Sequence, residues 1–78
     1  MVLLGGLRLI VFLRPAVEGQ PRPPITYASG RFEEDEHNGI RVYDTNNTLI
    51  REYGSGEISA WQVADANNEI IERSSYPL

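Results

Sequence analysis

A short pattern occurs twice in the second half of this 78-residue chain, at a spacing of 21 residues. The two copies, residues 42–53 and 63–74, align without a gap and share five identical positions. In each copy a strand-like segment leads through Asp-x-Asn-Asn into a second strand-like segment, which is typical of a β-hairpin. Two copies are too few for a solenoid, which needs about three or more repeats. The pattern therefore predicts two successive hairpins of one meander, over 42–53 and 63–74.

The repeated Asp-x-Asn-Asn predicts the type of turn. Asp44 and Asp65 suit the first position of a type I turn, where the side-chain oxygen accepts a backbone hydrogen bond. Asn47 and Asn68 suit the left-handed position that closes a three-residue hairpin loop. Carboxylates and amides could also bind calcium, but the Asp-x-[Asp/Asn]-x-[Asp/Asn]-Gly loop with a distal Glu is absent. We therefore favour turn chemistry over a metal site.

The first copy is similar to a known repeat. Its phrase Tyr-Asp-x-Asn-Asn-x-Leu-Ile-Arg-Glu-Tyr, which starts at Tyr43, resembles over about a dozen residues the tyrosine-aspartate repeats of large bacterial surface and toxin proteins. Those repeats usually have Asn-Gly in the turn, where this chain has Asn46 and Asn47. Any β-meander could produce such a phrase, so it implies strand, turn and strand but no particular family.

The residue inventory argues against an enzyme. The chain has no cysteine, so it has no thiolate nucleophile or zinc ligand, and all seven of its basic residues are arginine, which excludes a catalytic or phosphate-binding lysine. The one histidine, His37, follows the acidic run 33–36, whose neighbouring side chains alternate sides on an extended strand and do not converge on one ion. We expect no catalytic residue, cofactor or metal.

Charge is divided unevenly along the chain. Residues 1–24 carry +2 and residues 25–78 carry −6, which gives the net charge of −4. Because an acidic body repels phosphate backbones, no direct nucleic-acid binding is expected. The absence of cysteine is compatible with a reducing compartment, and we expect a cytoplasmic protein.

The apolar segment 1–14 predicts a packed strand. Leu7, Leu9, Val11 and Leu13 alternate with Arg8, Ile10, Phe12 and Arg14, so the two sets occupy opposite faces. A membrane-associated segment is the alternative, although the run is shorter than the roughly 20 residues that span a bilayer. A short helix or disorder is a third reading. Four prolines in residues 15–24 then predict an extended linker.

The rest of the chain, residues 25–78, predicts an antiparallel β-meander. We expect a strand over 25–32, a loop that holds most of the acidic run, and a strand over 40–44. Ile58 and Trp61 fall on opposite faces by strict alternation, so the strand 58–63 is either buried on both sides or bulged near residues 59 and 60. The fold class is therefore all-β, a small antiparallel meander of about five or six short strands. Self-association could complete so small a core.

A protein-interaction module is the function we expect, acting through a sheet face or an edge strand on another protein or on itself as a homo-oligomer. If Ile40, Val42 and Ile50 point inward, four aromatic and basic side chains form an exposed contact stripe: Arg41, Tyr43, Arg51 and Tyr53. The alternative function is an acidic regulator that occupies the basic nucleic-acid-binding surface of another protein. Its candidate acidic patch is Glu33, Glu34, Asp35 and Glu36.

Overall fold

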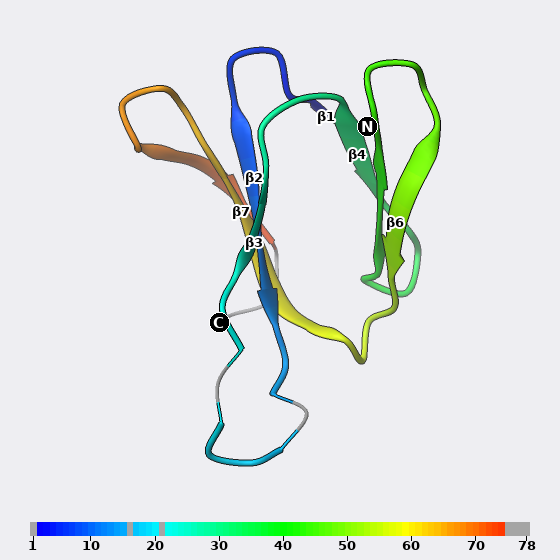
Figure 1. Cartoon of the computed structure of the whole chain (residues 1–78), viewed down its shortest axis with the longest axis vertical. Helices are drawn as coiled ribbons and strands as arrows, with labels where there is room; N and C mark the ends of the chain where they lie inside the picture. Colours follow the sequence, from blue (N-terminus) through cyan, green and yellow to red (C-terminus); the bar gives the residue numbers. More distant parts are fainter. Residues whose placement is uncertain (1, 16, 21, 75–78) are drawn as a thin grey trace.

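The computed structural model describes residues 2–15, 17–20 and 22–74 (Figure 1). Predictions that fall on Met1, on Ala16 and Pro21 of the predicted linker, and on residues 75–78 lie outside the described residues. The described chain contains eight short β-strands and no helix, which confirms the all-β prediction. The strands are β1 (Val2–Leu3), β2 (Arg8–Leu13), β3 (Ile25–Tyr27), β4 (Arg31–Glu34), β5 (Ile40–Tyr43), β6 (Leu49–Tyr53), β7 (Ile58–Ala64) and β8 (Ile70–Arg73).

The strands form two four-stranded antiparallel sheets, in the orders β1-β4-β5-β6 and β3-β2-β7-β8. We call them the first sheet and the second sheet. They lie next to each other in Figure 1, and the segment between β2 and β3 extends away from both of them at the bottom of the view. The N-terminal apolar segment supplies β2, whose alternation of half-buried and buried residues is the one predicted. Because β2 lies between β3 and β7, it is a central strand.

The chain passes between the two sheets three times: from β1 to β2, from β3 to β4 and from β6 to β7. The crossing from β3 to β4 divides the single strand predicted over 25–32. Gly30 lies at this crossing. Its φ of +91° is in the left-handed region, which residues other than glycine rarely adopt. A Cβ atom built on Gly30 would lie 2.0 Å from the carbonyl oxygen of Tyr43. This close approach requires glycine, and it depends on a contact distant in sequence.

One turn is used three times, at the β4-β5, β5-β6 and β7-β8 connections. In each turn one oxygen of an aspartate accepts the backbone N–H groups of the residues two and four positions further on, at 2.8–3.0 Å. The aspartates are Asp35, Asp44 and Asp65. The third residue after each aspartate has a φ between +64° and +67°, and these residues are Asn38, Asn47 and Asn68. The turn chemistry predicted for two hairpins is confirmed, and a third hairpin uses it as well.

The acidic run is therefore placed differently from the prediction. Glu33 and Glu34 belong to β4, and the loop holds only residues 35–39. The sequence pattern favoured a longer loop because a two-residue turn at Asn38 and Gly39 would pair polar with core positions. Asp35 and Gly39 close the turn, which leaves three residues, 36–38, in the loop between them. This loop length removes the conflict, because it pairs Glu33 with Arg41.

The two sheets are copies of one arrangement. The ladder between β7 and β8 repeats the ladder between β5 and β6 with every residue moved by 21 positions, including a bulge at the same place. The likeness extends to a third strand, because β4 pairs with β5 as β2 pairs with β7. Three rows of paired residues correspond: Arg31-Tyr43-Leu49 to Arg8-Ala64-Ile70, Phe32-Val42-Arg51 to Leu9-Val63-Glu72, and Glu33-Arg41-Glu52 to Ile10-Gln62-Arg73. The fold thus has an internal pseudo-symmetry that relates one sheet to the other.

The core lies between the inner faces of the sheets. Phe32 of the first sheet packs edge-on against Trp61 of the second, with ring centroids 4.9 Å apart. Ile58 and Trp61 both point inward because a bulge at Ser59 lets Phe12 pair with Ala60 and the next residue, Leu13, with Ile58. Both alternatives predicted for this strand are found, because β7 carries the bulge and is also buried on its other face at Ala60 and Ala64. The remaining buried members of this cluster are Leu4, Leu9, Val11, Leu13, Ile40, Val42, Tyr53 and Val63.

We predict that Gly30→Ala destabilises the protein by about 3 kcal/mol, because it adds overpacking against the Tyr43 carbonyl to left-handed strain. Gly6→Ala is the matched control: Gly6 has a φ of +76° but open space around its Cβ position, so strain alone should cost about 1 kcal/mol. Urea unfolding followed by circular dichroism measures both changes. Equal destabilisation by the two variants would contradict the close approach at Gly30.

Candidate functional site

The outer face of the second sheet is apolar at its centre. Its residues alternate with the core residues of the same strands, and they are Arg8, Ile10, Phe12, Thr26, Ala60, Gln62, Ala64, Ile70 and Arg73. Ile10 lies in the middle, paired with Thr26 on one side and Gln62 on the other. Ile10 and Phe12 are half-buried, and no strand of the described chain packs over them. The two alanines, Ala60 and Ala64, are 1% and 2% exposed, so the larger side chains form the accessible surface of this face.

The only charges among these outward-facing residues are positive. Arg8 donates hydrogen bonds to the carbonyl oxygen of Asp65, at 3.4 Å, and to the side-chain oxygen of Asn68. Neither acceptor is a carboxylate. Arg73 is exposed and has no ion pair or hydrogen bond to any described residue. This surface, which we call the basic apolar face, thus carries +2 on a chain whose net charge is −4.

The outer face of the first sheet has a different character at the corresponding positions. Its row Glu33, Arg41 and Glu52 is held by ion pairs of 3.9 Å and 2.6 Å. Arg31 pairs with Glu33 at 3.5 Å and places its guanidinium 3.8 Å from the centre of the Tyr43 ring. The hydroxyl of Tyr43 donates to Glu33, a hydrogen bond that raises the pKa of Tyr43. The charges of this face neutralise one another.

The four candidate contact residues do not form one stripe. Arg41 and Tyr43 lie on the outer face of β5, as expected. Tyr53, however, is 0% exposed and lies in the core. The guanidinium of Arg51 lies 4.9 Å from the centre of its ring, at the rim of that core.

The reason is a bulge at Ile50. The prediction required Ile50 to point inward, but Val42 pairs with Arg51 and the next residue, Tyr43, pairs with Leu49. Ile50 is the extra residue, and it is 50% exposed. The expectation of a shared Arg-Tyr surface is therefore wrong for Arg51 and Tyr53, while a contact role for Arg41 and Tyr43 stays a prediction.

The acidic run does not form a single patch either. Glu33 pairs with arginines on the outer face, whereas Glu34 lies at the neighbouring position of β4 and is exposed. Asp35 uses one carboxylate oxygen in its turn, and Glu36 lies exposed in the loop with its carboxylate 3.6 Å from His37. Only part of the run presents free negative charge to solvent.

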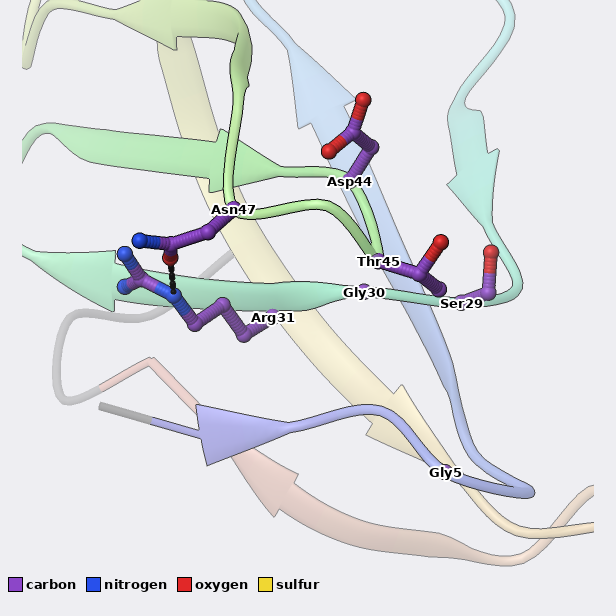
Figure 2. A pocket seen from close by; sticks show the side chains of 7 residues that line it. All are labelled: Gly5, Ser29, Gly30, Arg31, Asp44, Thr45 and Asn47. Atoms are coloured by element: carbon purple, nitrogen blue, oxygen red, sulfur yellow. Dashed lines mark hydrogen bonds between the residues drawn. The ribbon is translucent and has the colours of Figure 1, made fainter.

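A pocket of about 370 Å³ lies where the first sheet meets the crossings (Figure 2). It is lined by Gly5, Ser29, Gly30, Arg31, Asp44, Thr45 and Asn47. Figure 2 shows Arg31 reaching along β4 to Asn47, whose side-chain oxygen accepts its hydrogen bond at 2.7 Å. At the corresponding positions of the second sheet, Leu7 stands in place of Gly30 and Ala66 in place of Thr45. The lining combines one guanidinium with one carboxylate, so its charge selects neither an anion nor a cation.

Among the described residues, no group of three or more histidine, aspartate or glutamate side chains is placed to hold a metal ion. The described part of the chain also contains no helix long and apolar enough to cross a bilayer. Comparison of the chain with known protein families, curated proteins and solved structures yields no match.

Sequence reasoning missed the basic apolar face, although half of its signal is in the sequence. The alternation in β2 places Arg8, Ile10 and Phe12 on the face opposite the core. What the sequence does not show is that β7 contributes alanines beside them and that β8 brings Arg73 into the row of Ile10. Those neighbours follow from strand order, which depends on pairings between distant segments.

Tyr53→Phe tests the buried tyrosine pair. The hydroxyl oxygens of Tyr27 and Tyr53 are 2.5 Å apart, and we expect loss of this hydrogen bond to reduce the free energy of unfolding by about 1 kcal/mol. Tyr43→Phe, which removes a hydroxyl from the outer face, should change stability by less than about 0.5 kcal/mol. Chemical denaturation at pH 7 measures the free energy of unfolding of both variants. Equal losses of stability would contradict the placement of Tyr53 in the core and Tyr43 on the outer face.

The same pair predicts a loss of stability in alkali. Burial, and then the hydrogen bond to Tyr53, raise the pKa of Tyr27. A raised pKa in the folded state means that this stabilisation is complete below the ordinary tyrosine pKa of about 10 and is lost as the pH rises above it. Urea unfolding between pH 8 and 11 should show a steeper decline for the wild-type protein than for Tyr27→Phe. An equal decline in stability for the two proteins would contradict a raised pKa of Tyr27 in the folded state.

Asp35 predicts the opposite dependence in acid. Hydrogen bonds from the backbone N–H groups of Gly39 and then of His37 lower the pKa of Asp35. A lowered pKa in the folded state gives stability that is present above the ordinary aspartate pKa and is lost as the pH falls through the folded-state value. Asp35→Asn keeps an oxygen acceptor without the charge, so its stability should depend less on pH between about 5 and 2. Urea midpoints measured across that pH range test this prediction. Glu36→Gln is the control, and its stability should depend on pH as that of the wild-type protein does.

Proposed function

We propose that this chain is a non-enzymatic protein-interaction module that binds its partner through the basic apolar face. The observation that carries the proposal is the contrast between two corresponding surfaces of one fold. The first sheet presents an ion-paired row of Glu33, Arg41 and Glu52, whereas the second presents Ile10, Gln62 and an arginine without a partner among the described residues. When a partner covers a surface with an apolar centre and an unpaired charge at its margin, both apolar burial and charge complementarity contribute to the binding free energy.

The sheet face is a better candidate than the sheet edges. Two of the four edge strands, β1 and β3, are only two and three residues long. The other two, β6 and β8, each expose two aliphatic side chains, Leu49 and Ile50 on β6 and Ile70 and Ile71 on β8. Each of these strands is short and carries a bulge, at Ile50 and at Ile71. Bulges twist an edge away from regular pairing and so hinder the addition of another strand. A partner that packs against the outer face does not depend on regular backbone pairing with an edge strand.

Self-association through this face is less favourable than binding a different protein. Packing two copies face to face would bring +2 against +2, and no carboxylate lies among the outward-facing residues of the face to compensate. A homo-oligomer therefore stays a prediction of the sequence, and light scattering during size exclusion measures it.

The acidic-regulator alternative also stays a prediction of the sequence. Two of its four carboxylates, those of Glu33 and Asp35, already have partners within the chain. No observation favours this function over the interaction module.

Site-specific photocrosslinking in cells of the source organism tests the proposal. A benzoylphenylalanine at Phe12 lies on the basic apolar face, and one at Tyr43 lies on the outer face of the first sheet. We expect adducts from position 12 and not from position 43, with the captured protein identified by mass spectrometry. Adducts from position 43 alone, or from neither position, would contradict the proposal.

The pseudo-symmetry supplies matched variants for the same experiment. Ile10→Glu places in the second sheet the residue that the first sheet has at Glu33, and it should abolish crosslinking from position 12 because a carboxylate replaces the apolar centre. Glu33→Gln alters the corresponding outward position of the first sheet and should leave crosslinking intact. Circular dichroism of both variants verifies that the fold is retained.

A further inference from the structure

We infer that the partner segment accepted by the basic apolar face is an extended apolar segment bracketed by two carboxylates. This inference rests on the proposed function and names the chemistry of its ligand. Arg8 and Arg73 lie at opposite margins of the basic apolar face, one on β2 and the other on β8, with β7 between them. Of the two, Arg73 has no acceptor among the described residues, and Arg8 contacts only neutral oxygens. Both guanidinium groups can therefore gain a carboxylate without losing an ion pair.

The spacing of the two arginines constrains the ligand. They are two strands apart and in neighbouring outward rows, which places their Cα atoms roughly 12 Å apart for ordinary strand geometry. An extended segment advances about 3.4 Å per residue, so two carboxylates four residues apart match this separation. In an extended chain, residues i, i+2 and i+4 point to the same side. A segment with acidic residues at i and i+4 and an aromatic residue at i+2 thus presents all three side chains to the face.

The aromatic residue has a suitable place to rest. Between the arginines, on β7, lie Ala64 and Gln62, and Ile10 is paired with Gln62 on β2. Ile10 and Gln62 are half-buried, whereas Ala64 is only 2% exposed. A planar ring at position i+2 can therefore lie over Ile10 and the methylene groups of Gln62 without requiring a preformed cavity.

Charge distinguishes this ligand from the other surfaces that an apolar face could meet. A basic segment would be repelled by Arg8 and Arg73, and a neutral apolar segment would leave Arg73 without a counter-charge. A second copy of the chain offers its own basic apolar face, or the charged outer face of its first sheet, whose carboxylates already pair with Arg31 and Arg41. The observations therefore favour an acidic segment of a different protein.

Titration of the ¹⁵N-labelled full chain with three peptides tests the inference. The probe is acetyl-Gly-Glu-Thr-Phe-Thr-Glu-Gly-amide, and its two matched forms carry Gln or Lys in place of both Glu residues. We expect the acidic peptide to shift the amide signals of Ile10, Gln62 and Arg73. Exchanging Glu for Gln should raise the Kd about fivefold, since two exposed ion pairs contribute about 0.5 kcal/mol each. The Lys form should bind more weakly still, and added salt should weaken only the acidic peptide.

Arg73→Glu provides the test within the protein. Because Arg73 has no partner among the described residues, the substitution should not unfold the chain, and it should raise the Kd of the acidic peptide about tenfold by replacing attraction with repulsion. Arg22→Glu, in the exposed linker, changes the net charge equally and should alter the Kd by less than about twofold, as expected for a screened distant charge.

The outcomes separate this inference from the function on which it rests. If the Gln peptide binds the same face as tightly as the Glu peptide, or if Arg73→Glu has no more effect than Arg22→Glu, the acidic ligand is wrong while the interaction face stands. If none of the three peptides shifts signals of the face and position 12 gives no crosslink, both the ligand and the proposed function are wrong. Shifts confined to other surfaces would overturn the ligand assignment in the same way.

Discussion

The aspartate-capped turn is the interaction on which the rest of this structure depends. In each of its three occurrences one carboxylate oxygen accepts two backbone N–H groups, and an asparagine in the left-handed conformation completes the loop. A turn of fixed length fixes which residues pair across the hairpin, and a shift of one residue would exchange the inner and outer faces of a strand. The turns thereby decide which side chains reach the core and which reach solvent. In a chain without disulfides, this local specification takes the place of a covalent constraint.

The pseudo-symmetry separates what the fold requires from what it leaves open. At the central inward positions the two sheets carry similar residues, as Val42 and Val63 illustrate, whereas towards the ends of the strands they differ. At the central outward positions the sheets differ in kind: Glu33 corresponds to Ile10, and Arg41 corresponds to Gln62. Packing places little demand on outward positions, so their divergence is where a difference in surface chemistry can arise. The proposed interaction face follows from that comparison within a single chain.

Much of the local structure can be predicted from the sequence because it depends on near neighbours. Alternation predicts β2, and the repeated Asp-x-Asn-Asn predicts two turns. The mismatched phases of Ile58 and Trp61 predict either a bulge near Ser59 or burial of both faces. The third turn lacks the Asn-Asn pair and lies in an acidic run, so its signal is weaker. Local patterns do not predict why residue 30 must be glycine. The requirement comes from the close approach of the Tyr43 carbonyl on another strand.

The candidate site was less predictable for the same reason. A bulge at Ile50 reverses the expected facing of Arg51 and Tyr53, and bulge positions depend on how the turn and the partner strand fit together. The basic apolar face joins side chains from strands distant in sequence, such as Ile10 and Arg73. Strand order decides that association, and neither periodicity nor composition contains it.

The crossings between the sheets tie the two halves of the molecule together. The segment that forms β1 in the first sheet continues as β2 at the centre of the second, and the segment that forms β3 in the second continues as β4 in the first. Neither sheet is therefore a contiguous piece of chain, and no cut between strands could separate one whole sheet from the other. Most of the defining contacts join residues far apart in sequence, a topology associated with slow folding. Because both sheets contribute to one core, we expect the two halves to gain and lose their structure together.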